Sequence, residues 1–191
     1  MKIVRTTYLS LGTNLGNKLQ NLQSAIDEIN ASVGHVTKIS SIYKTKSWGF
    51  QGDDFYNICI EVSSSLSPEK MIQTVLHIEN KLGRSRHKEK GYKNRLIDID
   101  ILLFDDEIIF YNELKVPHPE MLNRKFVLVP LAEIAPNVIH PIAKKTILIC
   151  LQQCSDTESI EKIQEKLVRP ISLLEKYNYI AIEGNIGSGK T

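Results

Sequence analysis

Two aspartates separated by a single residue, Asp98 and Asp100, are the clearest candidates for chemistry in this chain. They lie in an apolar run, 96–104, that predicts a strand, in which alternate side chains share a face, roughly 6–7 Å apart. Two carboxylates at that spacing repel each other unless a cation lies beside them. Mg²⁺ suits the pair because it accepts one or two carboxylates and completes its shell with water and phosphate oxygens. An exposed acid pair balanced by Lys or Arg is the alternative.

A basic segment precedes this strand. Between residues 84 and 95 there are six Lys or Arg side chains and one acid, Glu89. Arg84 directly follows an expected helix end at Gly83, and Arg95 directly precedes the strand, so both are anchored. Because guanidinium groups neutralise charge on a transferring phosphoryl group, arginines beside an acid pair favour a polyphosphate site. A solvated basic loop is the alternative.

A histidine between two prolines follows the strand. Pro117 and Pro119 are expected to hold His118 in an extended turn, and an expected helix, 119–134, begins beside it. The free N–H groups of a helix start favour an anion, so His118 and Arg124 form a second candidate for phosphate contact. A histidine with a purely structural role in the turn is the alternative.

The last residues carry a separate motif. Residues 184–191 fit G-x-x-x-x-G-K-[ST], the phosphate-binding P-loop, after an expected strand, 179–183. The motif positions are Gly184, Gly189, Lys190 and Thr191. This stretch resembles the start of deoxynucleoside kinases. We therefore expect 178–191 to be the truncated, inert beginning of a second kinase domain.

Several periodic segments must position these residues. Helical spacing and end signals predict helices over 18–30, 67–82 and 146–154, and a helical stretch over 119–134 interrupted at Pro130. Alternation and apolar runs predict strands at 8–11, 37–43, 56–63 and 96–104, the last followed by a short partner strand at 107–111. On the strongest strand, the residues expected opposite the acid pair, in the core, are Ile97, Ile99, Ile101 and Leu103.

The order of these elements is βαββαβ. It predicts an α+β fold, a ferredoxin-like sandwich with additional C-terminal helices and a short hairpin. A doubly wound parallel fold would need a helix between 37–43 and 56–63, and the sequence offers none there. We expect a catalytic domain over 1–156 and a charged connector over 157–177, which contains a possible edge strand at 167–170.

Composition limits the classes of function. The 191 residues are 42% hydrophobic, enough for a core, and the net charge of +2 is too small for a general nucleic-acid binder. No run approaches the ~20 apolar residues of a membrane span, and no apolar leader opens the chain. The three cysteines follow no metal-binding pattern and are expected to be reduced thiols. We therefore expect a cytoplasmic protein.

Taken together, the motifs resemble the 6-hydroxymethyl-7,8-dihydropterin pyrophosphokinase family, or FolK family, over residues 8–154. The matching stretches are Leu-Gly-Thr-Asn-Leu-Gly at 11–16, Phe-Tyr-Asn at 55–57, Gly-Arg-Ser-Arg at 83–86, Arg-Leu-Ile-Asp-Ile-Asp-Ile at 95–101 and Val-Pro-His-Pro at 116–119. The resemblance implies transfer of pyrophosphate from ATP to the hydroxymethyl-pterin, which yields AMP and the pterin diphosphate in tetrahydrofolate biosynthesis.

The resemblance also implies roles for individual residues. Asp98 and Asp100 would hold two Mg²⁺ ions, and the catalytic residues would be Arg84, Arg95, Asp98 and Asp100. The ATP contacts would be Glu79, Arg86, Ile101, His118 and Arg124. The pterin pocket would be formed by Thr45, Trp48, Phe55, Asn57 and Phe126. In the full-length protein, a deoxynucleoside kinase domain would follow.

Two rival functions remain at this point. A nucleoside kinase that transfers only the γ-phosphoryl group rests on the P-loop alone and would release ADP instead of AMP. A non-catalytic module, regulatory or RNA-binding, would not need an acid pair beside Arg95, and an RNA-binding form would place aromatic residues on its sheet face.

Overall fold

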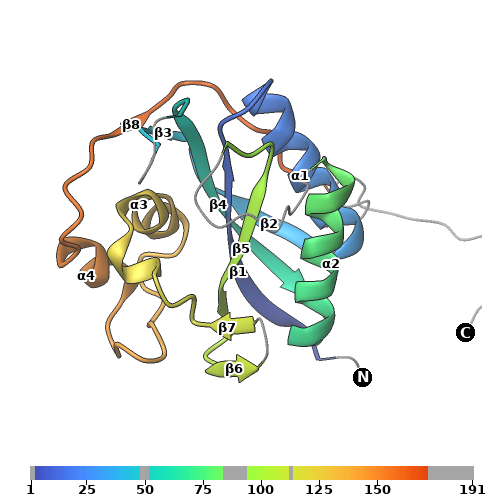
Figure 1. Ribbon diagram of the computed structural model, residues 1–191. Coiled ribbons are helices and arrows are strands. Elements are labelled where there is room, and N and C mark those ends of the chain that lie inside the picture. The colour runs from blue at the N-terminus through green and yellow to red at the C-terminus, as the bar shows by residue number, and fades with distance from the viewer. Residues whose placement is uncertain (1–2, 48–51, 84–93, 112–113, 172–191) are drawn as a thin grey trace, which may run out of the picture.

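A computed structural model describes residues 3–47, 52–83, 94–111 and 114–171 (Figure 1). Seven of the predicted site residues lie outside these ranges: Trp48, Arg84, Arg86, Gly184, Gly189, Lys190 and Thr191. The described elements are β1 (Arg5–Thr13), α1 (Lys18–Ser32), β2 (His35–Ile39), β3 (Tyr43–Thr45), β4 (Phe55–Ser64), α2 (Pro68–Lys81), β5 (Asp98–Phe104), β6 (Ile109–Tyr111), β7 (Leu114–Val116), a 3-10 helix (Met121–Asn123), α3 (Lys125–Ile134), α4 (Ile147–Gln152) and β8 (Ile160–Lys162).

The fold is a mixed α+β structure built on one large antiparallel sheet. Its strands lie in the order β5-β1-β4-β3-β8, and β2 pairs with β4 beside β3. Helices α1 and α2 cover one face of this sheet, and α3 and α4 lie on the other (Figure 1). A small separate hairpin, β6-β7, follows β5.

Local signals explain where the two long helices begin. The side chain of Asn17 accepts a hydrogen bond from the N–H of Gln20 at the start of α1. Ser67 does the same for Lys70 at the start of α2, where Pro68 occupies the first turn. Gly83, with a φ of +92°, follows the end of α2.

Two apolar clusters fill the spaces on either side of the sheet. The first lies against α1 and α2 and includes Leu9, Leu11 and Ile99. The second lies against α3 and α4 and includes Tyr8, Cys59 and Leu102. The two clusters therefore bury both faces of the sheet over part of its area. The polar candidate site residues of the sheet, such as Asp98 and Asn57, lie on the rest of the face toward α3.

One expectation for the strongest strand is wrong at Leu103. Tyr8 pairs with Leu103 but Leu9 pairs with Ile101, so Leu102 is an extra residue, a β-bulge. The bulge reverses the alternation beyond it. Ile97, Ile99 and Ile101 lie in the first cluster as expected, whereas Leu103 joins the second.

Other predicted elements differ in detail. The strand expected at 37–43 is divided into β2 and β3, because Ser40 makes its own bonds: its hydroxyl accepts from the N–H of Cys59 at 3.0 Å. The short strand expected to pair with β5 pairs with β7 instead. The helix expected from residue 119 begins as a 3-10 helix, and α3 then continues through Pro130.

The described part of the expected connector lies against the sheet. Its strand is β8, at residues 160–162, which pairs with β3. The segment expected as an edge strand, 167–170, forms no strand; there, Val168 exchanges two hydrogen bonds with the side chain of Gln23.

We predict that Gly34→Ala lowers the free energy of unfolding by about 2–3 kcal/mol. An added methyl group would overlap the carbonyl oxygen of Ser63 and lie 2.9 Å from the Cα of Ser64. This backbone cannot yield easily because β4 is paired on both sides. Denaturant titration measures the change. Ser32→Ala, at an exposed neighbouring position, is the control and should change it by no more than about 0.5 kcal/mol. Equal stability of the two variants would contradict the close contact.

Candidate active site

The two aspartates project from the same face of β5. Asp98 pairs with Gly12 of β1, and Asp100 pairs with Ser10. Both side chains are half-buried, whereas Ile99 between them is buried in the first cluster. The carboxylates therefore lie on the α3 face of the sheet, as strand alternation predicted.

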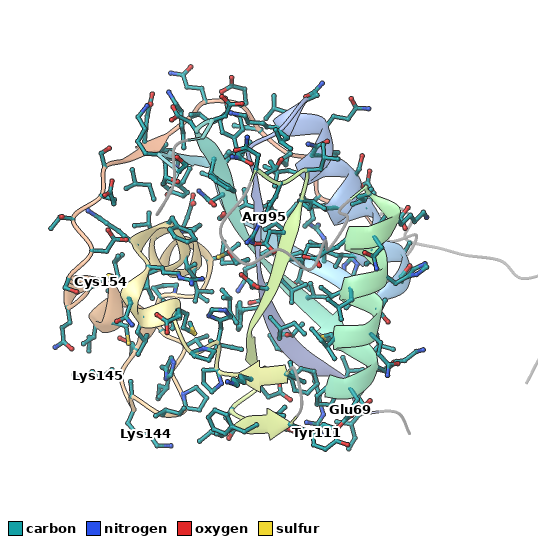
Figure 2. All side chains as sticks on the ribbon, viewed as in Figure 1. Glu69, Arg95, Tyr111, Lys144, Lys145 and Cys154 are labelled. Carbon is teal, nitrogen blue, oxygen red and sulfur yellow. The ribbon has the colours of Figure 1, made fainter. Side chains whose placement is uncertain are left out.

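Arg95, labelled in Figure 2, is fixed by contacts with two different parts of the chain. Its guanidinium Nη1 contacts the carboxylate of Asp98. Its backbone N–H donates to the side-chain oxygen of Asn14 at 2.6 Å, and its carbonyl accepts from the N–H of Asn14 at 3.0 Å. Asn14 is fully buried and also donates to the side chain of Asn94 at 2.7 Å.

The positioning role of Asn14 was missed by the sequence reasoning. The signal was present, because Asn14 belongs to the matching stretch at 11–16, but its partner lies far along the chain at Arg95. By tying the turn after β1 to the residues before β5, Asn14 fixes the position where the arginine meets Asp98.

Glu79, on α2, contacts β5 at the edge that does not pair with β1. Its side chain is fully buried, and its carboxylate accepts the N–H of Ile99 at 2.8 Å. Because β5 is an edge strand of the sheet, this N–H points away from β1 and needs another acceptor. Glu79 thus satisfies the backbone at the residue between Asp98 and Asp100. The side chain of Ile101, another predicted ATP contact, lies in the core and is 5% exposed.

His118 is attached to the bulge of β5. Its backbone N–H donates to the carbonyl oxygen of Leu102 at 3.0 Å. Its ring Nδ1 accepts the N–H of Glu120 at 3.2 Å, so the neutral ring carries its proton on Nε2. Burial and the neighbouring charge of Arg124 lower the pKa of His118, against the opposing effect of Glu120 and Asp98. A neutral imidazole with an Nε2–H is a hydrogen-bond donor at neutral pH.

Thr45 connects three of the predicted pterin residues. Asn57 Nδ2 donates to the hydroxyl of Thr45 at 2.9 Å, and Phe55 is the cross-strand partner of Thr45. Thr45 and Phe126 line one small pocket. Asn57 is also the cross-strand partner of Gly12, where a side chain would lie 3.2 Å from the amide oxygen of Asn57. The structure therefore brings Thr45, Phe55, Asn57 and Phe126 to one end of the sheet.

The acid pair has the composition expected for Mg²⁺. Within the described residues, no group of three or more His, Cys, Asp and Glu side chains could hold a metal ion. That excludes a closed protein cage there but leaves two adjacent carboxylates. Two carboxylates fit Mg²⁺, which takes its remaining ligands from water and substrate phosphates.

Among the described residues, we find no helix with the length and apolar character needed to cross a bilayer.

An acid pair with an adjoining arginine and histidine, on the same sheet as Thr45, Phe55 and Asn57, is suited to an enzyme that acts on a polyphosphate and a flat ring. Residues 8–136 match the family described as 7,8-dihydro-6-hydroxymethylpterin-pyrophosphokinase (HPPK). The chain belongs to this family, which acts in folate biosynthesis and uses ATP as co-substrate.

Curated relatives support the same assignment. The chain is 40% identical over 141 residues to a protein of Aquifex aeolicus, covering 73% of this chain and 86% of the relative. It is 41% identical over 150 residues to a protein of Synechocystis, covering 78% and 76%. Both relatives are named 2-amino-4-hydroxy-6-hydroxymethyldihydropteridine pyrophosphokinase.

A solved structure shares the fold. The wild-type HPPK-DHPS of Plasmodium falciparum with pteroate superposes with a TM-score of 0.67 at 16% identity, over 80% of this chain and 43% of that one. These comparisons give no support to the resemblance of 178–191 to deoxynucleoside kinases, which stays a prediction.

We predict that Glu79→Ala lowers the free energy of unfolding by about 2–4 kcal/mol, because it leaves a cavity and an unsatisfied N–H at Ile99. Glu79→Gln keeps an oxygen acceptor and should be less damaging. Denaturant titration compares both with Gln73→Ala, an exposed position on the same helix. If Glu79→Ala and Gln73→Ala were equally stable, the bond to Ile99 would have no energetic importance.

We predict that the His118 ring titrates below its usual pKa of 6.5. Because the folded-state pKa is lowered, the unfolded chain binds the proton first, and this group reduces stability as the pH falls through 6.5. Arg124→Gln should raise the pKa of His118 by removing a nearby positive charge. NMR titration of the ring measures both values, with Lys115→Gln as an exposed control. An unchanged pKa in Arg124→Gln would exclude the coupling.

Proposed function

We propose that this chain transfers the pyrophosphoryl group of ATP to 6-hydroxymethyl-7,8-dihydropterin, releasing AMP and the pterin diphosphate, a step of tetrahydrofolate biosynthesis. One observation carries the proposal, beyond membership of the family. Gly12 of β1 pairs with Asp98 on one side and Asn57 on the other. A candidate phosphate site and a candidate ring-binding residue are therefore held side by side on one rigid sheet.

The reaction is a displacement at phosphorus. The pterin hydroxyl oxygen forms a bond to the β-phosphorus of ATP, and the bond from that phosphorus to the oxygen bridging the α-phosphate breaks. AMP leaves with the bridging oxygen, and the hydroxyl proton is lost. Positioning and charge neutralisation supply most of the acceleration, and no covalent enzyme intermediate is needed.

The residues near β5 would bind the triphosphate. Asp98 and Asp100 would hold two Mg²⁺ ions, which neutralise charge on the phosphates when bound. Arg95 lies against Asp98, where its guanidinium would neutralise charge on the transferring group. His118 would donate its Nε2–H to a phosphate oxygen, and Arg124 would add a positive charge beside it. Arg84, Arg86, Glu79 and Ile101 complete the proposed catalytic and ATP-binding set.

The residues at the end of the sheet would bind the pterin. Asn57 Nδ2 is directed to the hydroxyl of Thr45 and the carbonyl oxygen of Tyr43, at 2.9 and 3.5 Å. The amide oxygen then faces the space above Gly12 and could accept from an N–H of the pterin edge. Phe55, Phe126 and Trp48 would stack on the flat ring.

Further proposals concern the fold type and the setting. The strand order, with α1 between β1 and β2 and α2 between β4 and β5, supports a ferredoxin-like sandwich. The enzyme would act in the cytoplasm on two small molecules, with no nucleic-acid or membrane partner. Cys59, Cys150 and Cys154 are all free thiols, which suits a reducing compartment. A fused deoxynucleoside kinase domain beyond residue 178 is also a proposal.

A product assay tests the proposed reaction. The protein is mixed with Mg-ATP and 6-hydroxymethyl-7,8-dihydropterin, and the nucleotides are separated by chromatography. We expect AMP only when the pterin is present. Pterin-dependent ADP would support a γ-phosphoryl kinase instead, and no pterin-dependent product from folded protein would support the binding-module reading.

We predict that Asp98→Asn and Asp100→Asn each reduce turnover by at least about 100-fold without unfolding the protein, since each loses half of the charge facing the metals. The exposed Asp106→Asn, just beyond β5, is the matched control and should keep wild-type turnover. If either active-site variant kept near-normal turnover, with its fold confirmed by circular dichroism, the assignment of two Mg²⁺ ions to this pair would be wrong.

A further inference from the structure

A short segment after α4 contacts both walls of the proposed pterin site, which are the start of α3, with Phe126, and β3, with Thr45. This clamp segment, residues 156–162, spans the end of the expected catalytic domain and the start of the expected connector, and it carries no motif of its own. In Figure 1 the chain runs from α4 past α3 to β8, beside β3. We propose that the clamp segment positions the pterin-binding side of the active site, with Asp156 and Ile160 as its two positioning residues. The inference rests on the proposed function.

Asp156 fixes the start of α3. Its Oδ2 accepts the N–H of Lys125, the first residue of the helix, at 2.8 Å. The N-cap residue of the helix, Arg124, makes no side-chain cap bond of its own. A carboxylate is the favoured partner of a helix N-terminus, because it binds free N–H groups and complements the helix dipole. The other oxygen, Oδ1, accepts the N–H of Glu158 at 2.9 Å, so one carboxylate joins α3 to the clamp segment.

The start of α3 carries two candidate ligand-binding residues. Arg124 immediately precedes the helix, and Phe126 is its second residue. The guanidinium of Arg124 lies 5.9 Å from the centre of the Phe126 ring. A shift of the first turn of α3 would therefore move a proposed phosphate contact and a proposed pterin contact together.

The strand of the clamp segment supports the opposite wall. β8 pairs with β3, so that Ile160 is opposite Thr45 and Lys162 is opposite Tyr43. Without β8, β3 would be an exposed edge of the sheet, free to bend away from its neighbour. The backbone that carries Thr45, and through it the orientation of Asn57, is thus held on both sides.

A salt bridge joins β8 to α3 a second time. Lys162 Nζ lies 3.1 Å from a carboxylate oxygen of Glu133, near the end of α3. The same carboxylate accepts the hydroxyl of Tyr43 at 3.1 Å. Burial and the charge of Glu133 raise the pKa of Tyr43 to about 12, so this hydroxyl remains a donor at any physiological pH.

Ile160 lies between the two walls. With Thr45 and Phe126 it lines a hollow of about 10 Å³, room for no more than a water molecule. The Ile160 side chain therefore sets the spacing between Thr45 on one wall and Phe126 on the other. Asp156 fixes the start of α3, β8 fixes β3, and Ile160 holds the two at their separation.

Steady-state kinetics on the full chain test the inference, with the KM values for pterin and ATP measured separately. Ile160→Ala should raise the KM for pterin about tenfold and leave that for ATP within about twofold. Asp156→Ala should raise both values, since Arg124 and Phe126 move together, by about fivefold to tenfold. Asp156→Asn keeps an acceptor oxygen for the N–H of Lys125 and should restore most of the loss.

Glu161→Ala is the matched control. Glu161 lies in β8 between Ile160 and Lys162, on the opposite face of the strand, and its carboxylate is paired with the half-exposed Lys44. It should change neither KM. An unchanged KM for pterin in both Ile160→Ala and Asp156→Ala would overturn the inference. Equal rises in KM and equal falls in Tm in all variants, Glu161→Ala included, would also overturn it, because they would indicate a strand with a purely structural role.

Pterin titration by calorimetry separates this inference from the proposed reaction. If the wild-type chain binds pterin but forms no AMP, the proposed function fails, and the pterin affinities of the Ile160 and Asp156 variants alone decide the inference. If the wild-type chain forms AMP and the variants bind pterin normally, only the inference fails. A wild-type chain that binds no pterin would overturn both.

Discussion

Antiparallel pairing of β1 on both of its sides is the constraint on which the site depends. β1 pairs with β4 over its full length and with β5 over most of it. The register of paired strands can change only by whole residues, and a slip of one residue would turn every side chain of the strand to the opposite face. Asp98, Gly12 and Asn57 therefore form one row across three strands, and Asp100 and Ser10 begin the next.

The α3 face of the sheet is divided between an apolar half and a polar half. Tyr8 and Cys59 lie under α3, where burial raises the pKa of the Cys59 thiol and keeps it protonated and unreactive. Gly12 and Asn57 lie further along the same strands, beyond the apolar cluster. The helix thus determines where the core ends and where polar chemistry can begin.

Local sequence signals explain much of this arrangement but not its long-range ties. Ser67 and Pro68 correctly predicted the start of α2, because capping depends only on neighbouring residues. The bulge at Leu102 was not predictable, since it arises from pairing with β1, a segment distant in sequence. Asp156, the last residue of the expected catalytic domain, carried no sequence signal of its role, because its partner on α3 is brought near only by the fold.

The same limit applies to Glu79. The pattern of α2 placed it on the helix, and the resemblance gave it a role in ATP binding, but neither indicated that its carboxylate would be fully buried on the backbone of β5. Sequence patterns predicted which residues would carry the chemistry. The residues that hold them in place were visible only in three dimensions.

If Asn57 binds the pterin ring as proposed, the row through Gly12 fixes how far that ring lies from the acid pair. Asp98 and Asn57 are separated by two strand spacings, about 10 Å, a length set by backbone hydrogen bonds and not by side chains. A ring system anchored at Asn57 reaches the acid pair only if its reactive arm spans that interval. Substitutions can change the chemistry at Asp98 or at Asn57, but not the distance between them, because strand pairing sets that distance. In the proposed mode of binding, the sheet itself would therefore select among heterocycles by the reach of their reactive arms.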